Sequence, residues 1–461
     1  MRDALTGGYE SADLDIAVKG DGFEIARTAA DTLGAKATFV PLDAARGTGR
    51  LVLGGPEPIT IDISTFKGAT IVQDLIRRDF TVNAMAVSIE DYREFGYRHL
   101  IDPCGGQADL RNKTVRVCSA EAFSDDPLRV LRAFRFAAIL GFSIDREVMV
   151  LIPPNLERLP SISSERIRDE LFAILSAPSS FPILRVMSDA LVIDAIIPEL
   201  KPMRGCGQNE YHHLDVWDHS LEAVRAIEEV VPRKLWCFGE PGDMVERYLR
   251  EEPVKGRPRW ALLKLAALFH DAGKPPTRFV DPTGRVRFFG HEKISEQLFL
   301  VVAERLKLAH RETETVAKWI RGHMRPSALL ARPTVSKRSI FRLHQRFGED
   351  LIGLFALFLA DLTASRGPAR PEGLDDTACL QLQKAVEIDA EMTHAPPTSL
   401  LNGRDVMEAF GLAPGPMVGS ILKRLAVLQA CGEISTREQA LSAARKFYRQ
   451  RLGEESKESR G

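Results

Sequence analysis

The stretch Ser11-Ala12-Asp13-Leu14-Asp15-Ile16-Ala17-Val18 decides the fold that we predict for this chain. Its alternation of acidic and apolar residues indicates a β-strand in which both aspartates face one side, while Leu14 and Ile16 face the core. Two carboxylates on one strand face, about 7 Å apart by the rise per residue, suit Mg²⁺. A solvated edge strand would show the same pattern, so other motifs must decide between the two interpretations.

A third carboxylate lies in a second strand-like segment, Ile59-Thr60-Ile61-Asp62-Ile63-Ser64, whose β-branched residues would pack against the core. Strands that carry Asp13, Asp15 and Asp62 could hold a pair of metal ions for phosphoryl transfer. The same region has helical periodicity at 23–33 and a strand-like run at 50–53. We therefore predict a small head that mixes short strands with helices.

The composition is that of a globular protein and excludes several other classes. A length of 461 residues predicts about three domains. The net charge of −1 gives no protein-wide basic field, so any RNA binding requires local basic patches. No apolar run approaches about 18 residues and the start is no signal peptide, so we expect a cytoplasmic protein without membrane association. The cysteines lack CxxC spacing and are expected to be free thiols: Cys104, Cys118, Cys206, Cys237, Cys379 and Cys431.

From about residue 120 onward the pattern is helical. Asp125-Asp126-Pro127-Leu128-Arg129 predicts a helix start with an acidic cap and a proline in the first turn. Arg129, Arg132 and Arg135 then recur at every third position and form a basic stripe. This stripe is either a solvated charged face or a contact surface for phosphate or RNA. Another helix is expected at 162–176, a polar surface excursion at 231–259, and a linker at 366–371.

Most histidines lie between residues 205 and 370. His219 is expected on a helix, His270 and Asp271 follow an apolar helix at 261–269, and Asp361 lies in an apolar helix at 354–362. Nitrogen and carboxylate ligands of this kind bind divalent metals that activate water. Six further residues complete the picture. His291 and His323 could form a second metal site or hold phosphate, and Lys274 could neutralise a phosphate. His212, His213 and His310 are expected to be surface or satisfied histidines.

The order of these motifs carries a resemblance. They are Asp13-Leu14-Asp15, Asp62, Arg77-Arg78-Asp79-Phe80-Thr81-Val82-Asn83-Ala84, Asp102-Pro103-Cys104-Gly105-Gly106 and Asp126-Pro127-Leu128-Arg129. In this order they resemble the bacterial class II tRNA nucleotidyltransferases and poly(A) polymerases. The histidine set resembles an HD phosphohydrolase domain, which some members carry, and segments 401–405 and 411–419 resemble the family's tail.

The resemblance implies the fold and the domains. We expect an α+β protein in which a polymerase-β-like nucleotidyltransferase mixed sheet precedes an extended, mostly α-helical body that includes the HD domain. The expected parts are a head at 1–120, a helical neck for nucleotide templating and RNA binding at 121–200, an HD domain at 201–370 and a helical tRNA-binding tail at 371–461.

The resemblance also implies residue roles. In the family, the two acidic residues that Asp13 and Asp15 match bind Mg²⁺. The third carboxylate, which Asp62 matches, helps to deprotonate the RNA 3′-hydroxyl. The Arg-Arg-Asp block is similar to one that holds ribose and phosphates. Asp126 and Arg129 resemble the amino-acid template that reads the base edge, as an acceptor and a donor for cytosine on one helix face. The nucleotide-binding candidates are therefore Arg2, Asp3, Arg78, Asp79, Asn83, Asp126, Arg129, Arg132 and Arg135, and the HD metal ligands are His219, His270, Asp271 and Asp361.

Two features depart from the family pattern. The chain begins at Met1-Arg2-Asp3, where members have already passed a strand and a Gly-Gly phosphate loop, so we expect a misassigned start codon or a weakened phosphate grip. Only the 14 residues 63–76 separate Asp62 from Arg77, where CCA-adding relatives carry a longer flexible loop. Since relatives that lack this loop tend to add only C residues, we hypothesise CC addition to the tRNA 3′ end from CTP, with ATP as a further candidate substrate.

Alternatives remain open at this point. One is full CCA addition or poly(A) synthesis by the same head. Another is an inactive RNA-binding head that delivers RNA to the HD site. That site, with a divalent metal of unknown identity, would trim 2′,3′-cyclic or terminal phosphates from RNA ends.

Overall fold

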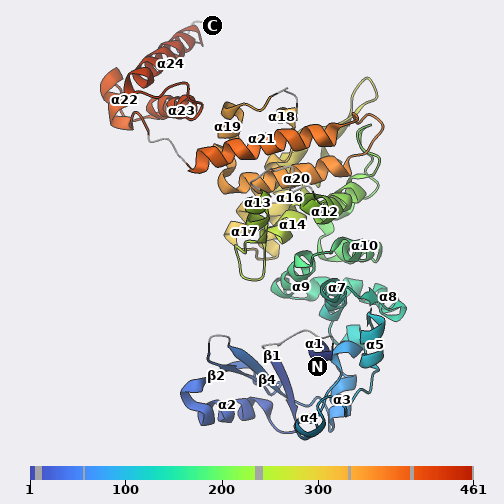
Figure 1. Ribbon diagram of the computed structural model, residues 1–461. Coiled ribbons are helices and arrows are strands. Elements are labelled where there is room, and N and C mark those ends of the chain that lie inside the picture. The colour runs from blue at the N-terminus through green and yellow to red at the C-terminus, as the bar shows by residue number, and fades with distance from the viewer. Residues whose placement is uncertain (6–12, 56–57, 234–241, 331–333, 395–398, 459–461) are drawn as a thin grey trace. The chain divides into compact units, whose positions relative to one another are not determined.

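The computed structural model describes residues 1–5, 13–55, 58–233, 242–330, 334–394 and 399–458 (Figure 1). The chain divides into two compact units, Met1–Pro198 and Glu199–Gly461. The first combines a four-stranded sheet with helices, and the described part of the second is helical apart from a small hairpin. The predicted α+β class, with a sheet near the N-terminus and a helical body, is confirmed.

The four-stranded sheet has the order β1-β4-β3-β2, formed by Asp13–Val18, Ile59–Thr65, Thr48–Leu53 and Ala37–Asp43. β1 pairs with β4 in parallel and the other neighbours are antiparallel, so the sheet is mixed as predicted. The register aligns Asp15 with Asp62, and Asp62 with Arg50. Since directly paired residues lie on the same face, these three charged residues form one row across the sheet.

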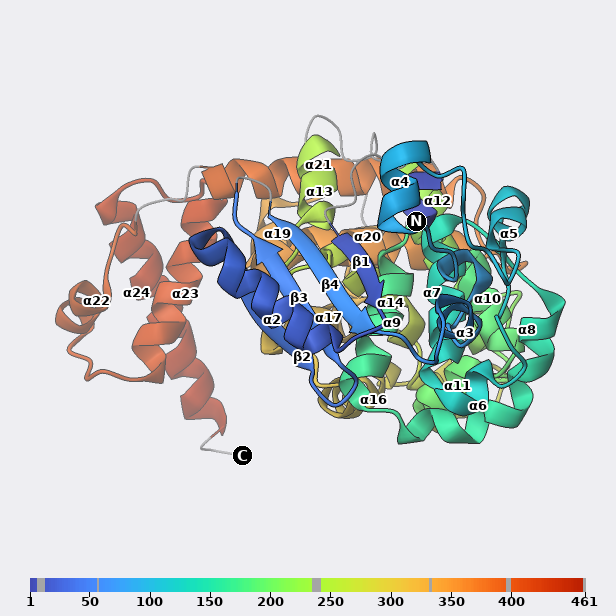
Figure 2. The ribbon, with the colours of Figure 1, turned by 90° about the horizontal axis from the view of Figure 1, so that it is seen from below.

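Helix α2 (Gly22–Leu33) covers the opposite face of this sheet (Figure 2). It buries Ala26 and Ala30 against Leu51 and Ile63. Its N-terminus is capped by the side chain of Asp21, which accepts hydrogen bonds from two backbone N–H groups. Because α2 packs over β2, β3 and β4, the edge strand β1 is only partly covered. The prediction that Leu14 faces the core is therefore wrong, since its side chain is 51% exposed.

The rest of the first unit is built from short helices around two longer ones. Helix α7 begins at Leu128, whose N–H is capped by Asp126 Oδ1 as predicted, and buries Leu131 and Phe134. Helix α9 packs against α7 and begins at Ser164. The elements of this part are α1 (Arg2–Leu5), α3 (Ile71–Ile76), α4 (Ile89–Phe95), α5 (Gly106–Asn112), β5 (Thr114–Val115), α6 (Ala122–Asp125), α7 (Leu128–Leu140), β6 (Ser143–Ile144), α8 (Arg146–Leu151), α9 (Ser164–Ser176), α10 (Phe181–Asp189) and α11 (Val192–Ile196).

The second unit has a helical core in which α14 and α20 are apolar on almost every side. Helices of this kind require burial all round, and both pack against α12 and α17. The elements before the tail are α12 (Val216–Arg233), α13 (Gly242–Arg250), α14 (Arg259–Phe269), α15 (Lys274–Thr277), β7 (Arg278–Val280), β8 (Val286–Phe288), α16 (His291–Arg305), α17 (His310–Gly322), α18 (Ser327–Leu330), α19 (Lys337–Phe347), α20 (Leu351–Ala364) and α21 (Leu374–His394).

Two segments predicted as surface connections are integrated into this unit. Within the expected excursion at 231–259, α13 buries Val245, Tyr248 and Leu249, which recur at helical spacing on one face. That expectation is wrong for α13, and residues 234–241 lie outside the described residues. The expected linker at 366–371 is anchored as well, because the N–H of Gly367 donates to the carbonyl of Tyr211 at 2.8 Å.

The C-terminal helices α22 (Gly403–Phe410), α23 (Pro416–Ala430) and α24 (Arg437–Glu458) share a small core of their own. Val406, Ile421 and Ala440 lie at its centre. Asn402 caps α22 in a reciprocal capping box with Asp405. The tail is helical, as predicted.

The sequence also predicted that no helix spans a membrane and that all cysteines are free thiols. Across the described ranges, every helix is too short or too polar to cross a membrane. Cys104, Cys118, Cys206 and Cys431 are free thiols. Cys379, buried in α21, is disulfide-bonded, so the expectation of free thiols throughout is wrong for this residue. Spacing along the chain does not show which sulfurs meet in the fold. Cys237 lies outside the described residues.

Candidate functional sites

The uncovered face of the sheet carries the acidic residues of the head. Asp15 is exposed in β1 and lies in register with Asp62 of β4. Arg50 of β3 holds Asp62 with two hydrogen bonds, from Nε to Oδ1 at 2.6 Å and from Nη2 to Oδ2 at 2.8 Å. Asp13 is two residues before Asp15 in the same strand, and its side chain lies outside the described part. The sheet thus brings Asp15 and Asp62 together.

This donor set fits a divalent cation that prefers oxygen ligands. Each carboxylate oxygen of Asp62 keeps a second lone pair beyond the one that Arg50 occupies. The exposed carboxylate of Asp15 lies beside it, and carboxylate oxygens are the ligands of Mg²⁺. Arg50 itself was missed from the sequence, because its place opposite Asp62 depends on the strand register.

A hydrogen-bonded network joins the Arg-Arg-Asp block to α1 and α7. The buried carboxylate of Asp79 accepts from Arg132 Nε at 2.8 Å and from Asn83 Nδ2 at 3.3 Å. Arg2 in turn donates from Nη1 to Asn83 Oδ1 at 2.9 Å, and its Nε donates to Asp3 at 2.8 Å. Five of the nucleotide-binding candidates therefore form one connected group.

The remaining candidates lie outside this group. Arg78 pairs with Asp74 at 3.2 Å. Arg129 donates to two backbone carbonyls, those of Arg77 at 3.1 Å and Ala122 at 3.3 Å, which fixes the direction of its guanidinium. The structure thus separates Arg78 from the network while placing Arg129 against the Arg-Arg-Asp block.

The expected template pair does not lie on one helix face. Asp126 precedes α7 and has an extended backbone, with φ −145° and ψ 104°. Pro127 explains this conformation, because a proline disfavours the helical region for the residue before it. The second carboxylate oxygen of Asp126 pairs with Arg166 at 3.0 Å, a partner that the sequence did not indicate.

The basic stripe of α7 is engaged within the first unit and is not a solvated face. Arg135 pairs with Glu170 of α9 at 3.2 Å. Burial raises the pKa of the Glu170 carboxyl, although Arg135 opposes this, and burial lowers the pKa of Arg135. The guanidinium groups of Arg2, Arg132 and Arg135 surround the ring of Phe136, at 5.2, 5.5 and 4.5 Å from its centroid.

In the second unit, the predicted HD residues converge from five helices. They come from α12, the C-terminal end of α14, the start of α16, the C-terminal end of α17, and α20. All except Asp361 are buried. The residues are His219, His270, Asp271, His291, His323 and Asp361.

Asp271 lies at the centre of this cluster. Its Oδ2 is 3.2 Å from His270 Nε2 and 3.7 Å from His219 Nε2. Its Oδ1 is 3.3 Å from His291 Nε2 and 3.7 Å from His323 Nε2. One carboxylate therefore joins two groups of imidazoles, each of which can hold a cation.

The imidazoles are oriented as metal ligands. His270, His291 and His323 each face a backbone carbonyl with Nδ1, at 2.8, 2.8 and 2.7 Å, which leaves the Nε2 lone pairs facing the cluster. Among the residues that the structure describes, His270 Nε2 and Asp271 Oδ1 are buried without a hydrogen-bonding partner. Since buried polar atoms without partners are costly, these residues fit a divalent metal.

Electrostatics support this interpretation. Burial raises the pKa of the Asp271 carboxyl, but His270 and Lys274 outweigh burial and hold that pKa well below its usual range. The same carboxylate and that of Asp361 raise the pKa of His270 to about 10, against the effect of burial. Burial and the neighbouring His270 lower the pKa of His323 to about 3. Burial likewise raises the pKa of the Asp361 carboxyl, but His219 and His270 outweigh burial and hold that pKa well below its usual range. Both carboxylates are therefore charged in the absence of a metal, and His270 then carries a proton on Nε2 that a bound metal would replace.

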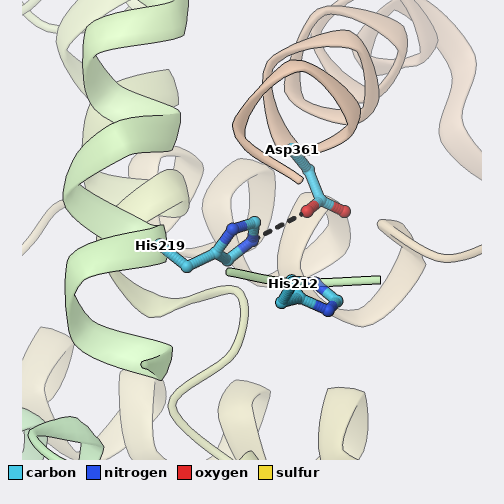
Figure 3. A group of neighbouring side chains, drawn as sticks. All are labelled: His212, His219 and Asp361. Carbon is cyan, nitrogen blue, oxygen red and sulfur yellow. Dashed lines mark hydrogen bonds and ion pairs between the residues drawn. The ribbon is translucent and has the colours of Figure 1, made fainter. Parts of the chain in front are cut away.

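Two more residues belong to this region. Lys274, expected to neutralise a phosphate, has its Nζ 2.6 Å from Asp271 Oδ2 and donates to Gln208 at 2.6 Å. His212 is half-buried beside His219, with ring centroids 4.8 Å apart, and its Nδ1 lies 2.9 Å from Asn209 Oδ1, so of the two expectations it is a satisfied histidine and not a surface one (Figure 3). Burial and Lys274 lower the pKa of His212 to about 3. His310 is a surface histidine as predicted, with an 87% exposed side chain.

Three family models match parts of the chain. Residues 1–116 match the model of the poly A polymerase head domain. Residues 141–204 match the model described as the probable RNA and SrmB-binding site of polymerase A. Residues 216–359 match the HD domain.

Curated relatives span nearly the whole chain. An A-adding tRNA nucleotidyltransferase of Deinococcus radiodurans is 34% identical over 459 residues, which cover 98% of this chain and 95% of the relative. A CC-adding tRNA nucleotidyltransferase of Geobacter sulfurreducens is 34% identical over 447 residues, covering 95% and 88%. The fold is similar to that of a Thermotoga maritima CCA-adding enzyme solved in complex with tRNA, with a TM-score of 0.61 and 23% identity over 97% of this chain and 89% of that one.

Proposed function

The chain belongs to the family of tRNA nucleotidyltransferases and poly(A) polymerases, and we propose that it adds two cytidine residues to the 3′ end of tRNA from CTP. The observation that carries this specificity is the short connection between the acidic strand and the Arg-Arg-Asp block. Strand β4 ends at Thr65 and α3 (Ile71–Ile76) leads directly into Arg77, so the connection consists of residues 66–70 and this short helix. Relatives of both specificities are 34% identical to the chain, so overall identity does not discriminate between CC and A addition.

Asp15 and Asp62, together with Asp13, would hold Mg²⁺ at the head. When bound, this ion activates the attacking hydroxyl and neutralises charge on the triphosphate. Arg50 would hold the Asp62 carboxylate in a fixed orientation. The Asp62 carboxylate would then help to remove the proton of the RNA 3′-hydroxyl. The group built on Asp79 orients Arg2 and Arg132 for the ribose and phosphates, and Arg129 donates to the base edge.

We also propose phosphohydrolase activity at the histidine cluster. His219, His270, Asp271 and Asp361 would hold a divalent metal, and Asp271 would share a second metal with His291 and His323. Such metals supply an activated water for phosphoester hydrolysis. The substrate class that fits a tRNA-binding chain is an RNA end that carries a terminal or 2′,3′-cyclic phosphate.

The proposed division of labour follows the chain. The head (1–120) and neck (121–200) bind nucleotide and the tRNA 3′ end, residues 201–370 hydrolyse phosphate, and the tail (371–461) binds tRNA. Arg445, Lys446 and Arg449 line one face of α24 and supply local positive charge for a phosphate backbone. A tRNA substrate places the enzyme in the cytoplasm.

The specificity is tested with tRNA transcripts that end before CCA, after one C or after CC, each incubated with Mg²⁺ and one labelled nucleotide. We expect CTP alone to extend the first by two residues and the second by one. ATP is expected to extend none of the three. Extension of the transcript ending in CC by ATP would contradict CC addition, and long ATP-dependent products would indicate a poly(A) polymerase.

A further inference from the structure

A loop at residues 205–215 lies against the HD cluster and is fixed at several points. The N–H of Gly205 donates to Asp215 Oδ2 at 2.6 Å, which closes the loop at its base. On the far side, the N–H of Gly367 donates to the carbonyl of Tyr211 at 2.8 Å. The contact is so close that a Cβ atom on Gly367 would lie 2.3 Å from the carbonyl oxygen of Glu210. The loop is therefore held firmly in place.

This loop delivers His212 to the edge of the cluster. Asn209 Oδ1 lies 2.9 Å from His212 Nδ1, so the Nδ1–H is used within the loop and the lone pair resides on Nε2. The ring of His212 meets that of His219 edge to face, with an interplanar angle of 85° (Figure 3). A histidine that donates one nitrogen to an oxygen acceptor and presents the other is the usual form of an imidazole metal ligand.

The neighbours of His212 are the ligands already assigned to the metal. One ligand-type atom each of His212, His219 and Asp361 lies within 4.8 Å of the other two. Asp361 Oδ1 is 2.9 Å from His219 Nε2 (Figure 3). His212 is only half-buried, whereas His219 and His270 are fully buried, so it occupies the more accessible side of the cluster.

We propose that His212 is a further ligand of the metal held by His219, His270, Asp271 and Asp361. The assignment rests on the proposed phosphohydrolase centre and adds a third imidazole to it. Imidazole nitrogens suit first-row transition metals better than Mg²⁺, so the ion bound at this site is a divalent transition metal.

The test is Co²⁺ binding to the full chain after treatment with a chelator, measured by equilibrium dialysis and by the visible absorption of the bound ion. The variants are H212A, the matched control H213A at the exposed neighbouring histidine, and H270A as a loss of an assigned ligand. We expect H212A to weaken Co²⁺ binding by about tenfold or more and to change its visible spectrum. H213A is expected to match the wild type in both.

The outcomes distinguish between two proposals, the ligand role of His212 and the HD metal centre itself. Wild-type Co²⁺ affinity and spectrum in H212A, with loss of binding in H270A, would remove His212 from the ligand set and leave the HD centre intact. Unchanged binding in H270A as well would overturn the metal centre itself. If H212A fails to fold, N209A replaces it. Loss of the Asn209 acceptor is expected to weaken Co²⁺ binding and to shift the visible spectrum. Wild-type Co²⁺ binding and spectrum in N209A would contradict the assignment.

Discussion

At the scale of single residues, the two proposed centres prepare their carboxylates in different ways. Asp62 lies on a partly exposed sheet face and has a fixed partner in Arg50, so its orientation is set without a metal. Asp271 is buried among imidazoles and retains a carboxylate oxygen without a hydrogen-bonding partner in the described residues. In the first arrangement the carboxylate has its partners without a metal, whereas in the second a bound metal would also satisfy a buried carboxylate oxygen.

Replacement of Arg50 tests the preparation of Asp62. R50A removes both hydrogen bonds to this carboxylate and is expected to lower kcat for CTP incorporation by about tenfold, the equivalent of one charge-assisted hydrogen bond. R50K retains the charge but not the bidentate geometry and should fall between R50A and wild type. Mn²⁺ binding, followed by electron paramagnetic resonance, provides a second readout that is expected to change as well.

The control for R50A is R27A, which removes an exposed ion pair with Glu24 on α2. Wild-type kcat and Mn²⁺ binding in R50A would show that the pair has no positioning role. A loss of equal size in R27A would attribute the effect to the stability of the head.

Replacement of Arg129 tests base selection. Two backbone carbonyls fix its guanidinium, and a base-edge contact specifies a nucleotide while phosphate contacts position it. R129A is therefore expected to reduce the preference for CTP over UTP by about tenfold, with little change in the Kd for tRNA. The measurement compares kcat/KM for the two nucleotides and tRNA binding by filter retention. An equal loss for both nucleotides together with weaker tRNA binding would assign Arg129 to the phosphates.

At the scale of elements, the sequence predicted those whose pattern is local. The acidic strand, α2, α14 and α20 follow from periodicity, and the candidate HD ligands follow from their motif. What it missed depends on contacts between distant segments. Arg50 meets Asp62 only through the strand register, and His212 reaches His219 only because its loop docks on Gly367. The exposure of Leu14 likewise depends on how far α2 extends across the sheet.

Helices α17 and α20, which both carry residues of the histidine cluster, pack closely against each other. Gly353 makes this close packing possible. A Cβ atom at this position would lie 2.1 Å from the ring of buried Trp319, whose Nε1 donates to the carbonyl of Asp350 at 2.7 Å. G353A is expected to destabilise the protein by about 1–3 kcal/mol, because the ring has no free space to move into.

The control is G419A in α23, where a Cβ atom would meet nothing within 4 Å in the described part of the chain. That variant should be stabilised by up to about 1 kcal/mol, since alanine favours a helix over glycine. Thermal unfolding of both variants measures the contrast. Equal melting temperatures would contradict the packing of α17 against α20.

A pH-dependent link joins α19 to α21. His344 Nδ1 lies 2.7 Å from Asp389 Oδ1, and this hydrogen bond raises the pKa of His344 despite partial burial. Because the folded pKa exceeds the unfolded value of about 6.5, the contribution is complete below that pH and is lost as pH rises through the folded pKa.

H344Q is therefore expected to lower the melting temperature more at acidic than at alkaline pH. The difference should be about 2 °C, for an interaction of about 1 kcal/mol in a unit of this size. H310Q, at an exposed histidine, serves as the control and should match the wild type. A deficit of H344Q that does not change with pH would exclude the charged pair.

At the scale of the whole molecule, the chain joins two proposed catalytic centres of different character. The head uses oxygen ligands on a sheet face, and the HD region uses imidazoles and carboxylates between helices. The two lie in separate compact units, each with its own core. Loss of one centre should therefore leave the chemistry of the other intact.

The most direct measurement of this claim assays both activities in the same preparations of wild type, D62N and D271N. One assay follows CTP incorporation into tRNA that ends before CCA, and the other follows phosphate release from RNA with a 3′-terminal phosphate. We predict that D62N loses incorporation by at least about 100-fold and keeps phosphate release, while D271N shows the reverse. Phosphate release by a wild type that incorporates no nucleotide, or incorporation that persists in D62N, would contradict the account and favour a head that only binds RNA.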